Sequence, residues 1–315
     1  MKKSIFAFLI LLSNLGFSQE KTDLTDVNKK EIIINPLLKG TLYSPLKETK
    51  KTNLLILIAG SGPTDRDGNQ KGMTNNSLKY LSEELSKNNQ AVFSYDKRII
   101  AQMAAGTVNE VTLSFDDFIN DAKEVIHFFK KQKKYSKIIV VGHSEGSLIG
   151  MIAANENADA FISLAGAGRT IDAVIVEQIE KQAPTLKDEV QKDLEILKSG
   201  QTFELKNKML ASLFRESVQP YMISWIKYNP QNEIKKLGIP VLLINGTKDL
   251  QVSISEAELL KKAKPEAKLV IIEDMNHIFK NIKGDDTENM KSYSDPNLPI
   301  TEKLVTAINL FIKSL

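Results

Sequence analysis

The stretch KIIVVGHSEGSLIGMIAA, residues 137–154, passes from a strand pattern to a helix pattern through a turn with a serine at its apex. Residues 138–141 are β-branched and apolar, which is typical of a strand buried on both faces of a parallel sheet. The turn, Gly142-His143-Ser144-Glu145-Gly146, is a G-x-S-x-G pentapeptide. Its glycines let the backbone fold sharply, which exposes the Ser144 hydroxyl and aims the Glu145 amide at the same point. The pattern predicts a nucleophilic serine; a serine that only caps a helix is the alternative.

The base for this serine has to come from three histidines, because a hydroxyl attacks only when a base takes its proton. His127 stands inside a predicted helix beside two phenylalanines, where packing or surface exposure is its expected role. His143 adjoins the serine, but the turn directs it elsewhere. His277 follows the predicted strand 268–272, in a loop at the carboxyl end of that strand. By elimination, His277 is the predicted base.

Asp249 is the predicted acid that orients this base. It follows the predicted strand 241–245 within a turn, which gives the chain order serine, acid, histidine that accompanies a G-x-S-x-G nucleophile. Glu273 and Asp274 are nearer to His277 in sequence, but they directly follow the strand that precedes it, and they are the second choice. An Asx turn or a helix cap is another ordinary role for Asp249.

A second oxyanion donor is expected in the glycine-rich turn that follows the predicted strand 54–59. There, Gly60-Ser61-Gly62 lets the backbone approach an oxygen closely. The predicted oxyanion hole therefore combines the backbone amides of Ser61 and Glu145.

The rest of this loop carries no metal or nucleotide signature. Asp65 stands where a dinucleotide fingerprint needs its third glycine. Asp65, Asp67 and Asn69 imitate the start of a calcium loop, but the loop glycine comes too early and Asn76 replaces the closing glutamate. The chain has no cysteine and 3 histidines, which argues against a zinc site. We therefore predict neither a metal nor a cofactor.

Buried strands alternate with amphipathic helices from residue 53 onward, which predicts a mostly parallel sheet flanked by helices. Between 169 and 238 no strand pattern occurs, and this segment is predicted to be a helical cap over the carboxyl ends of the strands. A peripheral bundle without a role in binding is the alternative. The α/β core then comprises 53–168 and 239–315, with predicted strands at 54–59, 91–95, 137–142, 160–164, 241–245 and 268–272 and predicted helices at 77–88, 114–132, 144–155, 254–263 and 301–314. Within the predicted cap, Phe214, Tyr221 and Trp225 are candidates to line an apolar acyl pocket, with ordinary helix packing as the alternative for each.

The beginning of the chain has the features of a secretory signal peptide, residues 1–18. Two lysines precede the apolar run 5–12, and small residues precede a cleavage point before Gln19. This run is too short to span a bilayer, so we predict export to the periplasm or the medium and no stable membrane anchor. Residues 19–52 are predicted to be a polar leader, up to residue 30, and an antiparallel hairpin. The formal net charge of +3 falls to +1 without the two lysines, which implies no nucleic-acid partner.

Several segments together resemble the α/β-hydrolase superfamily and, within it, exported bacterial hydrolases of the serine aminopeptidase-like and esterase group. They are GSGPTDRDGN (60–69), YDKR (95–98), GHSEG (142–146), FRESVQPYMISWIKYNP (214–230), GTKDLQV (246–252) and MNHIFK (275–280). The resemblance implies an α/β-hydrolase fold with a helical cap. It also implies Ser144, Asp249 and His277 as the catalytic triad, with Ser61 and Glu145 as amide donors.

Three functions remain open at this point. The favoured one is hydrolysis of carboxylic esters with small to medium acyl groups. An aminopeptidase acting on short peptides would need an anionic recess for the substrate ammonium, for which Glu177, Glu180 and Glu216 of the predicted cap are candidates. A non-catalytic binding protein on a hydrolase scaffold is the third, and a missing triad member would favour it, but none is missing. The sequence does not indicate an oligomeric state.

Overall fold

The computed structural model describes residues 26–315. The predicted signal peptide and most of the predicted polar leader lie outside these described residues. Within 26–315, no helix is long and apolar enough to cross a bilayer.

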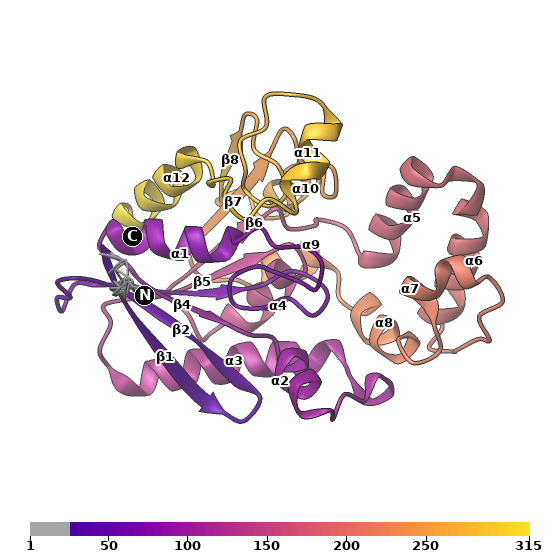
Figure 1. Cartoon of the computed structure of the whole chain (residues 1–315), viewed down its shortest axis with the longest axis horizontal. Helices are drawn as coiled ribbons and strands as arrows, with labels where there is room; N and C mark the ends of the chain where they lie inside the picture. The colour runs from indigo at the N-terminus through magenta and orange to yellow at the C-terminus, as the bar shows by residue number, and fades with distance from the viewer. Residues whose placement is uncertain (1–25) are drawn as a thin grey trace, which may run out of the picture.

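An eight-stranded sheet forms the centre of the molecule (Figure 1). Its strands are β1 (Val27–Asn35), β2 (Leu38–Pro45), β3 (Leu54–Ile58), β4 (Ala91–Tyr95), β5 (Ile138–His143), β6 (Ala160–Leu164), β7 (Val241–Gly246) and β8 (Lys268–Ile272). They lie in the order β1-β2-β4-β3-β5-β6-β7-β8. All neighbours from β4 to β8 are parallel, whereas β1 and β2 add an antiparallel edge. The predicted fold class is confirmed.

The first strand begins earlier than the sequence pattern predicts. Residues 27–30 are expected in the polar leader, but they pair with the end of β2 as part of β1. Val27 is buried in the core, and Lys29 Nζ lies 2.7 Å from Glu83 Oε1 of a helix beyond the sheet. Both contacts join segments far apart in sequence, so a local polarity pattern does not reveal them.

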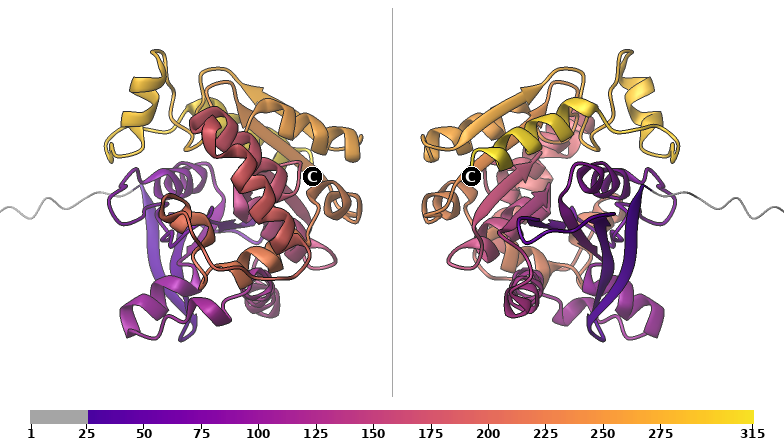
Figure 2. Two further views of the ribbon diagram at one scale, coloured as in Figure 1. Left: turned by 90° about the vertical axis from the view of Figure 1, so that its right-hand side faces the viewer. Right: turned by 90° about the vertical axis from the view of Figure 1, so that its left-hand side faces the viewer.

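Helices cover both faces of the sheet (Figures 1 and 2). The α-helices are α1 (Ser77–Lys87), α2 (Arg98–Ala105), α3 (Phe115–Gln132), α4 (Glu145–Ala154), α5 (Ile171–Gln182), α6 (Lys187–Lys198), α7 (Ala211–Phe214), α8 (Gln219–Ile226), α9 (Pro230–Lys235), α10 (Ile254–Ala263), α11 (Asp286–Ser292) and α12 (Glu302–Lys313). Short 3₁₀ turns are η1 (Glu110–Thr112), η2 (Pro184–Leu186) and η3 (Lys208–Leu210). Apolar side chains of α3, α4, α9 and α10 pack on one face of the sheet, and those of α1 and α12 pack on the other.

Strand β3 shows why its sequence is apolar throughout. Successive side chains of a strand point to opposite faces of the sheet, and here both faces are covered. Leu54, Ile56 and Ile58 therefore join one core, and Leu55 and Leu57 join the other. Each buried side chain of this size contributes about 1.5–3 kcal/mol to stability through the hydrophobic effect.

Helices α5 to α8, which lie between β6 and β7, stand to one side of the sheet (Figure 1) and face the reader in the left view of Figure 2. Helices α5 to α8 enclose a core of their own around Val190, Leu194 and Phe214. Helix α9 instead packs on the sheet core through Ile234. We call α5–α8, residues 171–226, the cap helices, after the cap that the sequence predicts here; their role as a cap stays a prediction. They meet the core where the Trp225 ring stacks on the Phe115 ring of α3, with centroids 5.3 Å apart.

Candidate active site

Ser144 occupies a strained turn between β5 and α4. Its φ of 55° and ψ of −120° are unfavourable for a residue with a Cβ. Both glycines of the pentapeptide are required by close approach. A Cβ on Gly142 would lie 2.2 Å from the Gly146 carbonyl oxygen, and a Cβ on Gly146 would lie 2.3 Å from the Ile58 carbonyl oxygen. The turn thus presents the serine at the carboxyl end of β5, and Glu145 begins the helix behind it.

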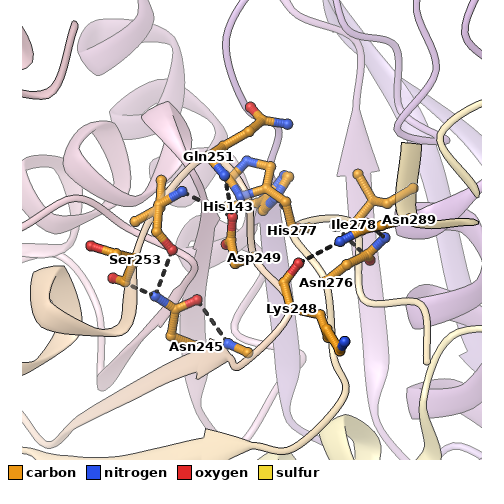
Figure 3. Close-up of polar contacts among 12 residues, drawn as sticks. His143, Asn245, Lys248, Asp249, Gln251, Ser253, Asn276, His277, Ile278 and Asn289 are labelled. Atoms are coloured by element: carbon orange, nitrogen blue, oxygen red, sulfur yellow. Dashed lines mark hydrogen bonds and ion pairs between the residues drawn. The ribbon is translucent and has the colours of Figure 1, made fainter. Parts of the chain in front are cut away.

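The structure brings Asp249 and His277 together from the loops after β7 and β8 (Figure 3). Asp249 Oδ2 lies 2.8 Å from His277 Nδ1, and both side chains are almost completely buried. Because a carboxylate only accepts, Nδ1 donates and Nε2 keeps a free lone pair. The other oxygen, Oδ1, accepts the amides of Gln251 and Val252 at 2.8 and 2.9 Å. The Asx-turn role and the contact with the base therefore use different oxygens of one carboxylate.

The second-choice acids take up other positions. Glu273 is exposed, and Asp274 forms an ion pair with Lys283. This pairing lowers the pKa of the Asp274 carboxyl. Both charges therefore belong to the surface, whereas Asp249 is the carboxylate in contact with His277.

Buried asparagines hold the loops that carry these two residues, and the sequence analysis missed them. Asn245 at the end of β7 donates to the carbonyls of Val252 and Ser253, at 3.1 and 3.0 Å, which closes the loop around Asp249 (Figure 3). Asn276 accepts the amides of Ile278 and Lys280 and donates to Asn289 and Ser292. Two features of the sequence indicate these residues. Asn245 is a polar residue at the end of an otherwise apolar strand, and Asn276 directly precedes the predicted base.

His143 is a second buried imidazole beside His277. Its Nε2 lies 2.9 Å from the His277 carbonyl oxygen, and its ring lies 4.8 Å from the Phe279 ring between centroids. Burial, followed by the neighbouring His277, lowers the pKa of His143 to about 3. A neutral His143 must carry its proton on Nε2 to donate to that carbonyl. The expectation that this residue is a structural neighbour of the serine agrees with these contacts.

The Ser61 turn lies directly beside Ser144. A Cβ on Gly60 would lie 3.2 Å from Ser144 Cβ, and Gln70 Nε2 donates to the Ser61 carbonyl oxygen at 2.8 Å. A cavity of about 280 Å³ is lined by this turn together with Ser144 and His277. The structure thus brings all of the predicted site segments after β3, β5, β7 and β8 to one edge of the sheet.

A second cavity of about 360 Å³ lies between the sheet core and the cap helices. Tyr221 and Trp225 line it, as does Ser61, so the two cavities meet at Gly60-Ser61-Gly62, which we call the oxyanion turn after its predicted role. The expectation for Phe214 is wrong. That side chain is completely buried inside the cap core, where its ring packs against Phe203 with centroids 6.0 Å apart.

Lys280 is a buried ammonium that joins the loop of His277 to two other segments by hydrogen bonds. Its Nζ donates to the carbonyls of Asn75, at 2.8 Å, and Leu298, and lies over the Tyr80 ring. Burial lowers the pKa of Lys280 to about 8, whereas an unfolded lysine has a pKa of about 10.4. Between these values the unfolded chain binds more protons, so this group makes the free energy of unfolding rise with pH.

We therefore expect Lys280→Met to abolish an increase of about 2 kcal/mol in the free energy of unfolding between pH 7.5 and 10. Urea denaturation of both proteins at several pH values measures it. The difference between wild type and variant should grow in favour of wild type over this range. Parallel pH profiles would contradict the assignment, because other groups contribute equally to both proteins.

The model of the serine aminopeptidase S33 family matches residues 71–281. The chain belongs to this family. The match spans Ser144, Asp249 and His277, the residues whose arrangement is described above.

The sequence is similar to that of esterase EstD of Thermotoga maritima, with 28% identity over 267 residues. The alignment covers 82% of this chain, and it covers 62% of the length of that esterase. Among solved structures, Est1E from Butyrivibrio proteoclasticus has a TM-score of 0.57 and 17% identity, covering 91% of this chain and 98% of that one. A Pyrococcus furiosus esterase has a TM-score of 0.55 and 16% identity, covering 92% and 91%. These two similarities show the α/β-hydrolase fold.

Proposed function

We propose that this protein hydrolyses carboxylic esters of small to medium acyl groups through an acyl-enzyme on Ser144. The observation that carries the proposal is the shared cavity of the strained Ser144 and of His277, the imidazole paired with Asp249. Membership of the S33 family and the relationship to an esterase support ester hydrolysis at the general level.

The mechanism follows from the proton positions. His277 Nε2 takes the Ser144 proton while Oγ attacks the ester carbonyl carbon, and Asp249 stabilises the imidazolium that forms. The amides of Ser61 and Glu145 hold the oxyanion, and such a donor is typically worth about 3 kcal/mol of transition-state stabilisation. His277 then returns its proton to the leaving alcohol. Water, deprotonated by the same imidazole, releases the carboxylic acid and restores the serine.

The charges around the site favour an ester over a peptide with a free amino end. An aminopeptidase needs a carboxylate free to bind the substrate ammonium. In the cap helices and the segment before α8, Glu177 and Glu180 form ion pairs with basic side chains and Glu216 accepts a backbone amide. The two carboxylates that line the second cavity, Glu110 and Glu145, are also paired with basic side chains. This pattern supports a neutral substrate.

The two cavities suggest how such an ester is placed. The larger one has an aromatic wall from Tyr221 and Trp225 and suits an apolar acyl group of small to medium size. The cavity around Ser144 is lined by hydroxyl and amide groups, among them Thr64 and Gln251, and suits the alcohol part. We therefore assign the larger cavity to the acyl group.

The test is a side-by-side assay of 4-nitrophenyl esters with acyl chains of two to twelve carbons and aminoacyl 4-nitroanilides. We expect ester turnover with an optimum at short to medium chains, and anilide cleavage at least about 100-fold slower, because the carboxylates near the site are already paired. Faster cleavage of anilides would make the protein a peptidase. No turnover of either, in folded protein that an alkyl phosphonate does not label at Ser144, would overturn the proposal.

A further inference from the structure

Lys97 is a buried ammonium behind the oxyanion turn. Its side chain is 4% exposed, and its Nζ lies 3.0 Å from the Gly60 carbonyl oxygen and 2.6 Å from Glu145 Oε1. The ammonium also lies over the Phe118 ring, 4.4 Å from its centroid. In the sequence, Lys97 belongs to the YDKR segment of the family resemblance, which implies no role for it.

The Gly60 carbonyl and the Ser61 amide belong to one peptide unit. This unit is planar and trans, so its C=O and N–H bonds point in opposite directions. An ammonium that holds the carbonyl oxygen on one side therefore fixes the direction of the Ser61 N–H on the other. The positive charge also polarises the peptide, because linked hydrogen bonds in a low-dielectric site strengthen one another. The ammonium therefore makes the Ser61 N–H a stronger hydrogen-bond donor and fixes its direction.

Glu145 connects the second donor to the same ammonium. Its backbone amide is the other proposed oxyanion donor, and its 2% exposed carboxylate pairs with Lys97. Tyr221 from α8 lines the same cavity as Lys97 and Glu145. One ion pair thus joins both donor segments.

The ion pair is not explained by stability. Removing two charges from water is expensive, and buried pairs can often be replaced by apolar residues without loss of stability. A role in positioning the oxyanion donors explains the location of Lys97 better, because its ammonium contacts Gly60 and Glu145, one in each donor segment.

We propose that Lys97 is a positioning residue, which aims and polarises the Gly60–Ser61 peptide toward the oxyanion that forms on the substrate. This inference rests on the proposed function of Ser144. It adds a residue that lies at the wall of the proposed acyl cavity and acts through the Gly60–Ser61 peptide.

The test variant is Lys97→Met, which keeps the apolar stem and removes the charge. We expect kcat for 4-nitrophenyl butyrate to fall about 10²-fold with KM changed less than about threefold, because only transition-state stabilisation is affected. The inhibition constant of a matching trifluoromethyl ketone, which forms an oxyanion on the serine, should rise by a similar factor. ¹³C NMR of the labelled ketone adduct should show its hydroxyl ionising at higher pH in the variant.

Lys264→Met is the matched control. Lys264 is also a buried lysine, and its Nζ lies 2.7 Å from the Leu237 carbonyl oxygen and 2.6 Å from Glu266 Oε1. These residues precede β7 and β8, whereas the candidate site follows the carboxyl ends of these strands. Its replacement should leave kcat and ketone binding within about twofold of wild type. If Lys97→Met fails to fold because Glu145 is left unpaired, the double variant with Glu145→Gln removes both charges and should show the same loss in kcat and ketone affinity.

The outcomes separate the two proposals. Ester hydrolysis that depends on Ser144 but is unchanged in Lys97→Met overturns the positioning role and leaves the proposed function standing. A loss of kcat with unchanged ketone affinity and an unchanged adduct titration also overturns it, because a general structural defect would produce that pattern. Wild-type protein without esterase activity or serine labelling removes the proposed function and this inference together.

Discussion

Replacing Ser144 with alanine is expected to lower kcat for 4-nitrophenyl esters on the order of 10⁶-fold, to the level left by binding and the amide donors alone. The variant lacks the Oγ that forms the acyl-enzyme, and no change in KM compensates for that loss. Steady-state rates together with mass spectrometry of phosphonate-treated protein measure it. The wild-type protein should gain one phosphonate on the peptide that contains Ser144, and the variant should gain none there.

Ser147→Ala is the matched control for this variant. Ser147 lies one turn further along α4. Its hydroxyl is buried, and its Oγ lies 2.7 Å from Ser163 Oγ. It should retain activity within a few fold. Comparable loss in both variants would mean that the helix, and not the Ser144 hydroxyl, is at fault.

A stability measurement on the same position separates chemistry from folding. Because Ser144 has φ 55° and ψ −120°, a glycine there removes the steric conflict of the Cβ. We expect Ser144→Gly to be inactive but more stable, with a free energy of unfolding about 1 kcal/mol higher. A destabilised glycine variant would show that this turn is not strained.

Local signals made much of the site predictable from sequence. The pentapeptide marks the turn at Ser144, the small number of histidines isolates His277, and the strand before Asp249 gives the chain order of the site. The structure brings Asp249 and His277 within hydrogen-bonding distance, while their catalytic role stays a prediction. Each of these inferences needs only residues within one strand and the loop that follows it.

Contacts between distant segments were not predictable in the same way. Lys97 and Glu145 are 48 residues apart, and their pairing depends on β4 and β5 both lying next to β3. The sequence shows only that a charged residue follows each of two apolar strands, Lys97 after β4 and Glu145 after β5. Phe214 failed for the opposite reason. Its aromatic character is equally suited to a pocket wall and to a helical core, and only the packing of the cap helices decides between them.

Asp249→Asn is expected to lower kcat by about 10⁴-fold while the protein stays folded. The geometry fixes how the new side chain sits. The amides of Gln251 and Val252 both point at Oδ1, so the asparagine oxygen must take that place and its NH₂ must face His277. An NH₂ group only donates, so Nδ1 has to accept, and the imidazole proton moves to Nε2. His277 then presents N–H to Ser144 and cannot take its proton.

The measurement compares this variant with Asp274→Asn, which removes the second-choice acid from its surface ion pair with Lys283. We expect the Asp274 variant to keep wild-type kcat within about twofold, because surface ion pairs contribute little. Both variants should unfold at similar denaturant concentrations, since asparagine retains the two amide contacts of Asp249. A large loss in Asp274→Asn with a small one in Asp249→Asn would reverse the assignment. Equal, small losses of kcat in both variants would mean that His277 needs no acid. The loop that Asn276 holds would then be enough to orient the His277 ring.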